Sequence, residues 1–163
     1  MRNEADRLVA DYSDLILRLS YTYLGSTQDA EDICQTVLVK LMTSPQAFVS
    51  KEHERAWVVR VTANACKDLL RSASRQRNLG LDALKGREPA DREADAPESP
   101  VARAVQHLAE EQREAIHLHY YEGYKIEEIA RMTQASPAAV AKRLSRARDT
   151  LRTVLGRGKH EQQ

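Results

Sequence analysis

Apolar residues recur at steps of three and four over residues 5–24, which is the period of one face of an amphipathic helix. Gly25 predicts the end of this helix, because glycine adopts at little cost the left-handed conformation that closes many helices. The predicted inner face comprises Leu8, Val9, Tyr12, Leu15, Ile16, Leu19, Ser20 and Tyr23.

A second helix is predicted to begin at Ser26 or Thr27. Ser26 and Asp29 have the spacing of a variant capping box, and the helix dipole favours acids in a first turn. Residues 43–50, which include Pro45, then predict a loop. The apolar face of this second helix comprises Ala30, Ile33, Cys34, Val37, Leu38 and Leu41.

Ser50 can cap a third helix that runs to about Ala73. We interpret Trp57 as a core residue rather than a platform for base stacking, because it shares a helical face with Val61. The three helices predict one compact helical domain over residues 1–74. The predicted buried stripe of the third helix comprises Trp57, Val58, Val61, Ala65, Cys66, Leu69 and Leu70.

The apolar pattern fails over residues 75–99, where glycines and prolines interrupt a charged run. Between residues 78 and 100, six acids outnumber three bases. This stretch is therefore predicted to be a flexible acidic linker. The interrupting residues are Gly80, Gly86, Pro89 and Pro97.

Helical periodicity resumes at Pro100, which suits the first position of a helix capped by Ser99. Its predicted face comprises Val101, Ala104, Val105 and Leu108. A further helix is predicted over residues 111–121, ending before Gly123. That helix carries Ala115, Ile116, Leu118 and Tyr120.

Two closely spaced helices complete the pattern, one over residues 126–132 and one that begins at Pro137 after the capping residue Ser136. This is the arrangement of a helix-turn-helix, whose second helix lies against the major groove of DNA. The chain is therefore predicted to be all-α, with an N-terminal helical bundle and a four-helix C-terminal domain over residues 100–157. The predicted inward residues of the last two helices are Ile126, Ile129, Ala130, Val140, Leu144, Ala147, Leu151 and Val154.

The 163 residues carry a formal net charge of only +1, but the charge is unevenly distributed. Residues 131–159 hold eight lysines and arginines and one acid, Asp149. Cations on a helix release counterions from DNA phosphates, and arginine also binds guanine edges. A solvated basic face on an ordinary helical hairpin would show the same charges. The predicted DNA contacts of the last helix are Ser136, Ala138, Ala139, Lys142, Arg143 and Arg146.

Other features narrow the class of protein. Cys34 and Cys66 lack Cys-x-x-Cys spacing and are predicted to be buried thiols in a reducing compartment. We expect a soluble, cytoplasmic protein without membrane insertion, because no secretory signal and no apolar run of membrane-spanning length is found. His117 and His119 stand two residues apart and face different sides of a helix, so no metal is expected. Since no nucleophile with a base and no phosphate loop is found, neither a cofactor nor an enzyme activity is expected.

Three stretches resemble one family. EGYKIEEIARMTQASPAAVAKRLSRARDTL, residues 122–151, resembles region four of the extracytoplasmic-function sigma factors, the domain that binds the minus-thirty-five promoter element. DAEDICQ, residues 29–35, is similar to the family's helix for docking on RNA polymerase core. Residues 55–71 match the family's R-A-W-x-x-R-x-x-x-N-x-x-x-D-x-x-R pattern through Arg55, Ala56, Trp57, Arg60, Asn64, Asp68 and Arg71. The resemblance covers nearly the whole chain outside the linker.

The resemblance implies roles for residues of the N-terminal domain. Polymerase docking is implied for Asp29, Glu31, Asp32 and Gln35, although acids at a helix N-terminus also act as simple capping charges. Recognition and opening of the minus-ten element is implied for a polar face of the third helix, with the loop over residues 45–53 as a pocket for an unstacked base. An exposed intrahelical ion-pair network would show the same spacing. The residues of that face are Asn64, Lys67, Arg71 and Arg75.

The sequence departs from the family pattern at three positions. Gln134 stands in the turn of the helix-turn-helix, where the family often has glycine. Ala139 and Ala141 stand where polar or basic residues are common, so two contacts are absent and the promoter sequence is not specified. For the acidic linker, the family implies a path through the polymerase channel, and a simple tether is the alternative.

The leading hypothesis is a transcription initiation factor whose partners are RNA polymerase core, promoter DNA and an anti-sigma factor. A second hypothesis is a helix-turn-helix regulator that never joins polymerase and uses its N-terminal domain to dimerise or to sense a ligand. A third is a helical bundle for protein interaction with an incidental basic tail. Residues 29–35 and 64–71 favour the first, because a plain repressor does not need them.

Overall fold

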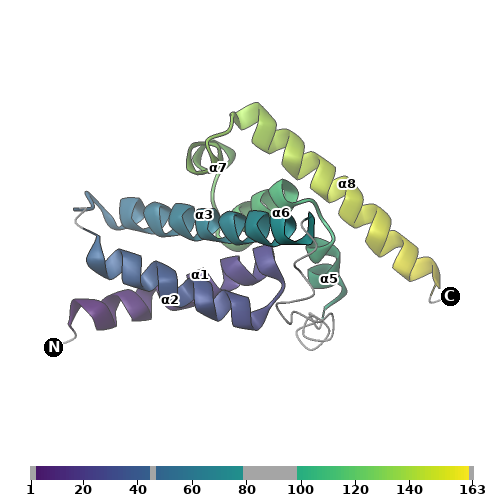
Figure 1. Ribbon diagram of the computed structural model, residues 1–163. Helices are drawn as coiled ribbons and strands as arrows, with labels where there is room; N and C mark the ends of the chain where they lie inside the picture. Colours follow the sequence, from purple (N-terminus) through teal and green to yellow (C-terminus); the bar gives the residue numbers. More distant parts are fainter. Residues whose placement is uncertain (1–2, 45–46, 79–98, 162–163) are drawn as a thin grey trace. The chain divides into compact units, whose positions relative to one another are not determined.

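The computed structural model describes residues 3–44, 47–78 and 99–161, although the side chains of residues 77–78 and 157–161 are not described (Figure 1). Within these ranges the chain is all-helical, which confirms the predicted fold class. The chain divides into two compact units, Met1–Asp95 and Ala96–Gln163. None of the described helices is both long and apolar enough to cross a membrane.

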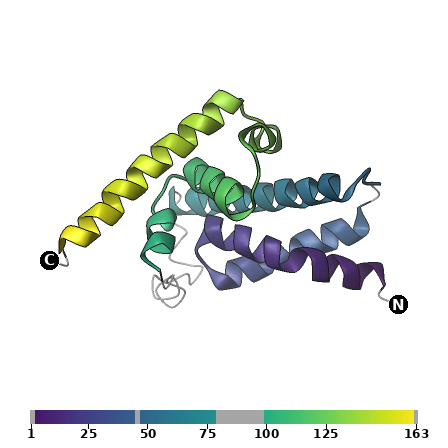
Figure 2. The ribbon, with the colours of Figure 1, turned by 180° about the vertical axis from the view of Figure 1, so that it is seen from behind.

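The N-terminal unit is a bundle of α1 (Glu4–Leu24), α2 (Thr27–Thr43) and α3 (Lys51–Asn78). Helices α1 and α2 lie side by side, and α3 packs on both (Figures 1 and 2). Gly25 ends α1 in the left-handed conformation with φ 64°, as predicted. Ser26 accepts a hydrogen bond from the amide of Asp29 at 3.2 Å, and Ser50 accepts one from the amide of His53 at 3.0 Å.

The core of this unit follows the predicted faces on α1 and α2 except at two positions, because Val9 is 43% exposed and Leu38 is half-buried. The buried face of α3 differs from the prediction. Its buried residues are Glu54, Val58, Val59, Thr62, Ala63 and Cys66, whereas Trp57, Val61, Ala65, Leu69 and Leu70 are half-buried. Thr62 can occupy the core because its hydroxyl donates to the carbonyl oxygen of Val58 at 2.7 Å. A polar residue of this kind is invisible to an apolar pattern.

Helix α3 is longer than the sequence predicted, since it continues past Ala73 to Asn78. Residues 75–78, which the sequence placed at the start of the linker, are therefore helical. No glycine or proline occurs between Ala73 and Gly80, and arginine and glutamine are good helix formers. Residues 79–98 of the predicted linker lie outside the described residues.

A buried polar cluster joins α1 to α3. Glu54 is 8% exposed and its two carboxylate oxygens accept hydrogen bonds from Arg7 at 3.1 and 3.0 Å. The hydroxyl of Tyr12 donates to the same carboxylate. Hydrogen bonds from Arg7 hold the pKa of Glu54 below its usual value, against the opposing effect of burial. We call these three residues the Glu54 clamp.

The C-terminal unit consists of α5 (Pro100–Gln106), α6 (Glu110–Ile116), the π-helical turn η2 (His117–Tyr121), α7 (Ile126–Thr133) and α8 (Pro137–Glu161). Helix α8 packs against α5, α6 and α7. Ser99 caps α5 as predicted, with its hydroxyl 3.0 Å from the amide of Ala102. Two residues predicted to lie on inner faces, Val101 and Val154, are 47% and 40% exposed, and Tyr120 is 55% exposed.

The helix predicted over residues 111–121 is an α-helical segment followed by the π-helical turn η2. The wider turn brings together residues five apart in sequence. His117 Nε2 lies 2.7 Å from Glu122 Oε2, and both side chains are buried. His119 Nδ1 lies 2.9 Å from the carbonyl oxygen of Tyr124. These local partners account for both histidines as parts of the scaffold.

Helices α7 and α8 form the predicted helix-turn-helix. Gln134 ends α7 in the left-handed conformation with φ 56° and ψ 43°, at the place where the family often has glycine. Ser136 caps α8, and its hydroxyl lies 3.0 Å from the amide of Ala139. The predicted inward residues are buried except for the half-buried Ile126 and Leu151 and the exposed Val154; the buried ones are Ile129, Ala130, Val140, Leu144 and Ala147.

Loss of the Glu54 clamp should destabilise the N-terminal unit. Glu54→Gln removes the charge that Arg7 and Tyr12 bind, and we expect a loss of about 2 kcal/mol in the free energy of unfolding at pH 7. Glu52→Gln, an exposed carboxylate in the same helical turn, is the matched control and should change little. Equal effects of the two substitutions would contradict the role of the clamp.

The clamp also predicts a pH dependence. Because the pKa of Glu54 is lowered in the folded state, its contribution is present above the ordinary value of 4.5 and is lost as the pH falls through the folded-state pKa. The free energies of unfolding of the wild type and of Glu54→Gln, measured by chemical denaturation at several pH values, should therefore converge in acid.

Gln134→Gly should stabilise the C-terminal unit by about 0.5 to 1 kcal/mol, because glycine has no Cβ to oppose a left-handed backbone. Ala135→Gly, one residue later at a position without positive φ, is the control and should destabilise by a similar amount. Amide hydrogen exchange in α7 and α8 would measure both. A loss of protection in Gln134→Gly would show that the backbone carries no strain there.

Candidate nucleic-acid interface

The first half of α8 gathers the predicted DNA contacts on one face. Val140, Leu144 and Ala147 are buried, so the positions between them point outward. The exposed members of the predicted set are Ser136, Ala138, Lys142 and Arg146, and the half-buried members are Ala139 and Arg143. Ser136 has a structural task as well, because it caps the helix.

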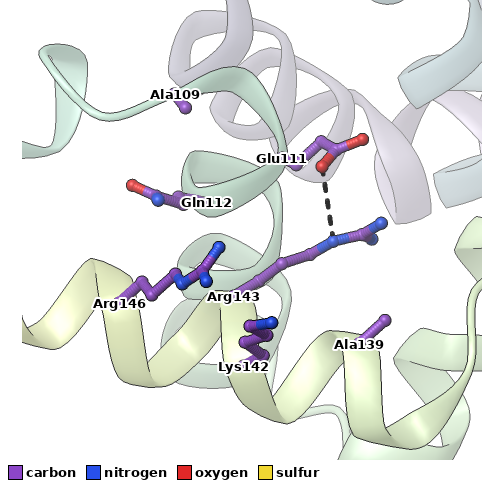
Figure 3. A pocket seen from close by; sticks show the side chains of 7 residues that line it. All are labelled: Ala109, Glu111, Gln112, Ala139, Lys142, Arg143 and Arg146. Atoms are coloured by element: carbon purple, nitrogen blue, oxygen red, sulfur yellow. Dashed lines mark ion pairs between the residues drawn. The ribbon is translucent and has the colours of Figure 1, made fainter.

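This face of α8 borders a pocket of about 200 Å³ within the C-terminal unit. Figure 3 shows the start of α6 on one side and α8 on the other. The pocket is lined by Ala109, Glu111, Gln112, Ala139, Lys142, Arg143 and Arg146. Three of these residues are cations and one is an acid. We call this hollow the basic pocket. The sequence did not indicate that residues before Gly123 would border the DNA-facing helix.

The cations of the basic pocket have different surroundings. Arg143 Nε lies 3.5 Å from Glu111 Oε2, with the two side chains 25% and 68% exposed. Within the described part of the chain, neither Lys142 nor Arg146 forms an ion pair, and both are exposed. The charges available to an incoming anion are therefore those of Lys142 and Arg146 first.

A second carboxyl group of α6 lies near Arg143. Glu114 is 2% exposed, and burial raises its pKa to about 7, while the charge of Arg143 acts in the opposite direction. Arg143 therefore lies in the field of two carboxyl groups from one helix. The pattern of apolar residues could not have predicted this proximity, because Arg143 is about thirty residues from Glu111 and Glu114 in sequence.

On α3 the predicted polar face is present. Asn64, Arg71 and Arg75 are exposed and Lys67 is half-buried. Arg71 Nη1 lies 3.4 Å from Asp68 Oδ1, so the ion pair that the spacing left open as an alternative does form for these two residues. Both side chains are more than two-thirds exposed, and such a pair contributes little to stability.

Near the start of α3, three aromatic rings form a small cluster. The Phe48 ring contacts His53 with centroids 5.4 Å apart and Trp57 with centroids 5.7 Å apart. The backbone amide of Val49 donates to His53 Nδ1 at 3.3 Å. Trp57 is half-buried rather than fully enclosed in the core. Residues 45–46 of the predicted base pocket lie outside the described residues.

On α2 the predicted docking residues do not share one environment. Glu31, Asp32 and Gln35 are exposed, whereas Asp29 is half-buried at the capped start of the helix. The exposed side of α2 continues through two apolar residues, Val39 at 59% and Met42 at 42% exposure. Both residues lie off the predicted inner face, and the apolar pattern gives no role to either one.

No group of three His, Cys, Asp or Glu side chains that could hold a metal ion occurs among the described residues. Cys34 and Cys66 are free and buried. Burial also raises the pKa of the Cys34 thiol, which makes the reactive thiolate less available.

Comparison with known proteins places both units in one family. Sigma-70 region 2 matches residues 8–76, and Sigma-70, region 4 matches residues 99–151. The ECF RNA polymerase sigma factor SigM of Mycobacterium tuberculosis is 30% identical over 152 residues, which cover 93% of this chain and 76% of SigM. SigE of Mycolicibacterium smegmatis is 30% identical over 165 residues, and the match covers 96% of this chain but 63% of SigE.

A solved structure agrees in fold. The sigma factor RpoE from Bartonella quintana, crystallised with the anti-sigma factor NepR, superposes with a TM-score of 0.73 at 21% identity, covering 92% of this chain and 95% of that one. Family membership decides against the two other hypotheses, a regulator that acts apart from polymerase and a helical bundle for protein interaction. The chain belongs to the extracytoplasmic-function class of the sigma-70 family, whose members are non-enzymatic RNA polymerase subunits that direct promoter-specific transcription initiation.

Proposed function

We propose a division of labour between the two units. Residues 1–74 act as sigma region two, which docks on RNA polymerase core and recognises and melts the minus-ten element. Residues 100–157 act as region four, which binds the minus-thirty-five element. Residues 75–99 connect them, with the first four residues helical. The observation that carries the proposal is the row of outward cations on α8, directly after a capped turn.

The chemistry of α8 suits duplex DNA. Lys142 and Arg146 lie one helical turn apart on the exposed side, free of acidic partners within the described residues. Unpaired cations release counterions when they meet phosphates, and this favours association. The side chains at the start of α8 are small, so the backbone can approach the groove closely. They belong to Ser136, Ala138 and Ala139. Arg143 is the residue of this face that we assign to a base edge.

For the N-terminal unit we propose two surfaces. On α2, polymerase core contacts Glu31, Asp32 and Gln35, together with Asp29 in the first turn, whose amide donates to the capping Ser26 hydroxyl. The exposed Val39 and Met42 add apolar area on the later turns of that helix.

On α3, the proposed minus-ten contacts are Asn64, Lys67, Arg71 and Arg75. Trp57, which the sequence placed in the core, is half-buried, so we now propose that its ring and that of Phe48 offer an aromatic surface on which an unstacked base can lie. The ion pair between Asp68 and Arg71 orients the arginine in the free protein and is weak enough to be exchanged for a phosphate.

We further propose that an anti-sigma factor holds this chain inactive in the cytoplasm, as a partner of the kind crystallised with the Bartonella quintana protein. The surfaces proposed for polymerase and DNA are exposed in the free chain, and a partner that covers them would block both functions. Co-purification from the native host tests this part.

Run-off transcription tests the division of labour. The chain is combined with RNA polymerase core and a library of promoter fragments, and the start sites are sequenced. We expect specific starts that depend on two sequence elements. DNA binding by the chain without specific initiation would contradict the proposal.

Arg146→Ala should weaken binding of the holoenzyme to the selected promoter about fivefold and reduce the slope of log affinity against log salt by about 0.9. Arg152→Ala is the matched control, because this residue of the same helix lies outside the basic pocket and is paired with Asp149 at 3.3 Å. Titration of labelled promoter at several salt concentrations measures both. The groove assignment of α8 fails if Arg146→Ala behaves like the control.

A further inference from the structure

An acid stands in the basic pocket. Glu111, from the first turn of α6, is the one carboxylate among its seven lining residues, opposite three cations of α8. A carboxylate in this place opposes the approach of DNA phosphates, so it reduces affinity for any duplex. Its position therefore needs an explanation other than tighter binding.

The partner of Glu111 is Arg143. Figure 3 shows the Arg143 side chain extended toward Glu111, with the ion pair drawn between them. The contact uses Nε of the guanidinium, at 3.5 Å. Arginine binds guanine through its two terminal nitrogens, which this contact does not occupy. A carboxylate at Nε thus restrains the side chain and leaves its base-reading end free.

The ion pair between Glu111 and Arg143 contributes little to the stability of the fold. Glu111 is 68% exposed, and exposed ion pairs contribute little to stability because water screens them. Arg143, by contrast, is only 25% exposed, so its stem is held against the protein. The consequence of the pair is therefore the orientation of Arg143.

We propose that Glu111 is a positioning residue that makes promoter recognition selective. It holds Arg143 toward one base edge and partly neutralises it, so that Arg143 contributes less to binding of arbitrary phosphates. Without Glu111, Arg143 reaches whichever phosphate is nearest, on any sequence. This inference rests on the proposed role of α8 in duplex binding.

The test compares two duplexes of equal length, the promoter selected by run-off transcription and a scrambled version, each titrated with holoenzyme. Glu111→Gln should raise affinity for the scrambled duplex about threefold and steepen its salt slope by about 0.9. The ratio of promoter to scrambled affinity should fall about threefold to tenfold. The thermal unfolding midpoint of the chain should not change.

Glu110→Gln is the matched control. It removes the same charge one residue earlier on α6 but does not line the basic pocket. It should change both affinities by the same factor and leave their ratio unaltered. If Glu111→Gln behaves like this control, the effect is one of net charge and the positioning role is overturned.

A double-mutant cycle separates this inference from the proposed function. If Glu111 acts through Arg143, Glu111→Gln should not change the ratio further in an Arg143→Ala background. Loss of discrimination in Arg143→Ala without any loss in Glu111→Gln would overturn the positioning role and leave the groove assignment intact. If Arg143→Ala leaves the ratio unchanged and Arg146→Ala leaves affinity unchanged, the assignment of α8 itself fails.

Discussion

The burial of Val140, Leu144 and Ala147 against the rest of the C-terminal unit determines which side of α8 faces outward. A helix that places one stripe in a core has no freedom to rotate, so every other position has a fixed direction. For that reason the cations of α8 lie together on its outward side. The left-handed residue Gln134 contributes by setting the direction in which the chain leaves α7.

Two ion pairs illustrate how burial decides what a charge does. In the Glu54 clamp the carboxylate is nearly enclosed and receives hydrogen bonds from two side chains, so its loss leaves the buried Tyr12 hydroxyl without this acceptor. In the pair between Glu111 and Arg143 the carboxylate is largely in water. The first pair therefore belongs to the stability of the N-terminal unit, whereas the second chiefly affects the direction of one side chain.

The scaffold beneath the helix-turn-helix depends on the π-helical turn η2. Its wider turn allows the buried pair of His117 and Glu122, and the hydroxyl of Tyr120 accepts a hydrogen bond from Arg148 of α8 at 2.9 Å. The exposed tyrosine and a basic residue of α8 are thereby connected. The exposed hydrogen bond between Arg148 and Tyr120 joins η2 to α8, whereas the buried pair of His117 and Glu122 holds the turn itself.

Local signals in the sequence determined most of the helix ends, the inner faces of α1 and α2, the helix-turn-helix and the family, because caps and periodicity act within a few residues. Tertiary packing decided the rest. It turned the buried face of α3 toward Thr62 and Ala63, and left Val9 and Val154 in water, because helix contacts choose among faces of similar hydrophobicity. It also brought Glu111 to Arg143, since a pair so distant in sequence depends on how α6 and α8 cross.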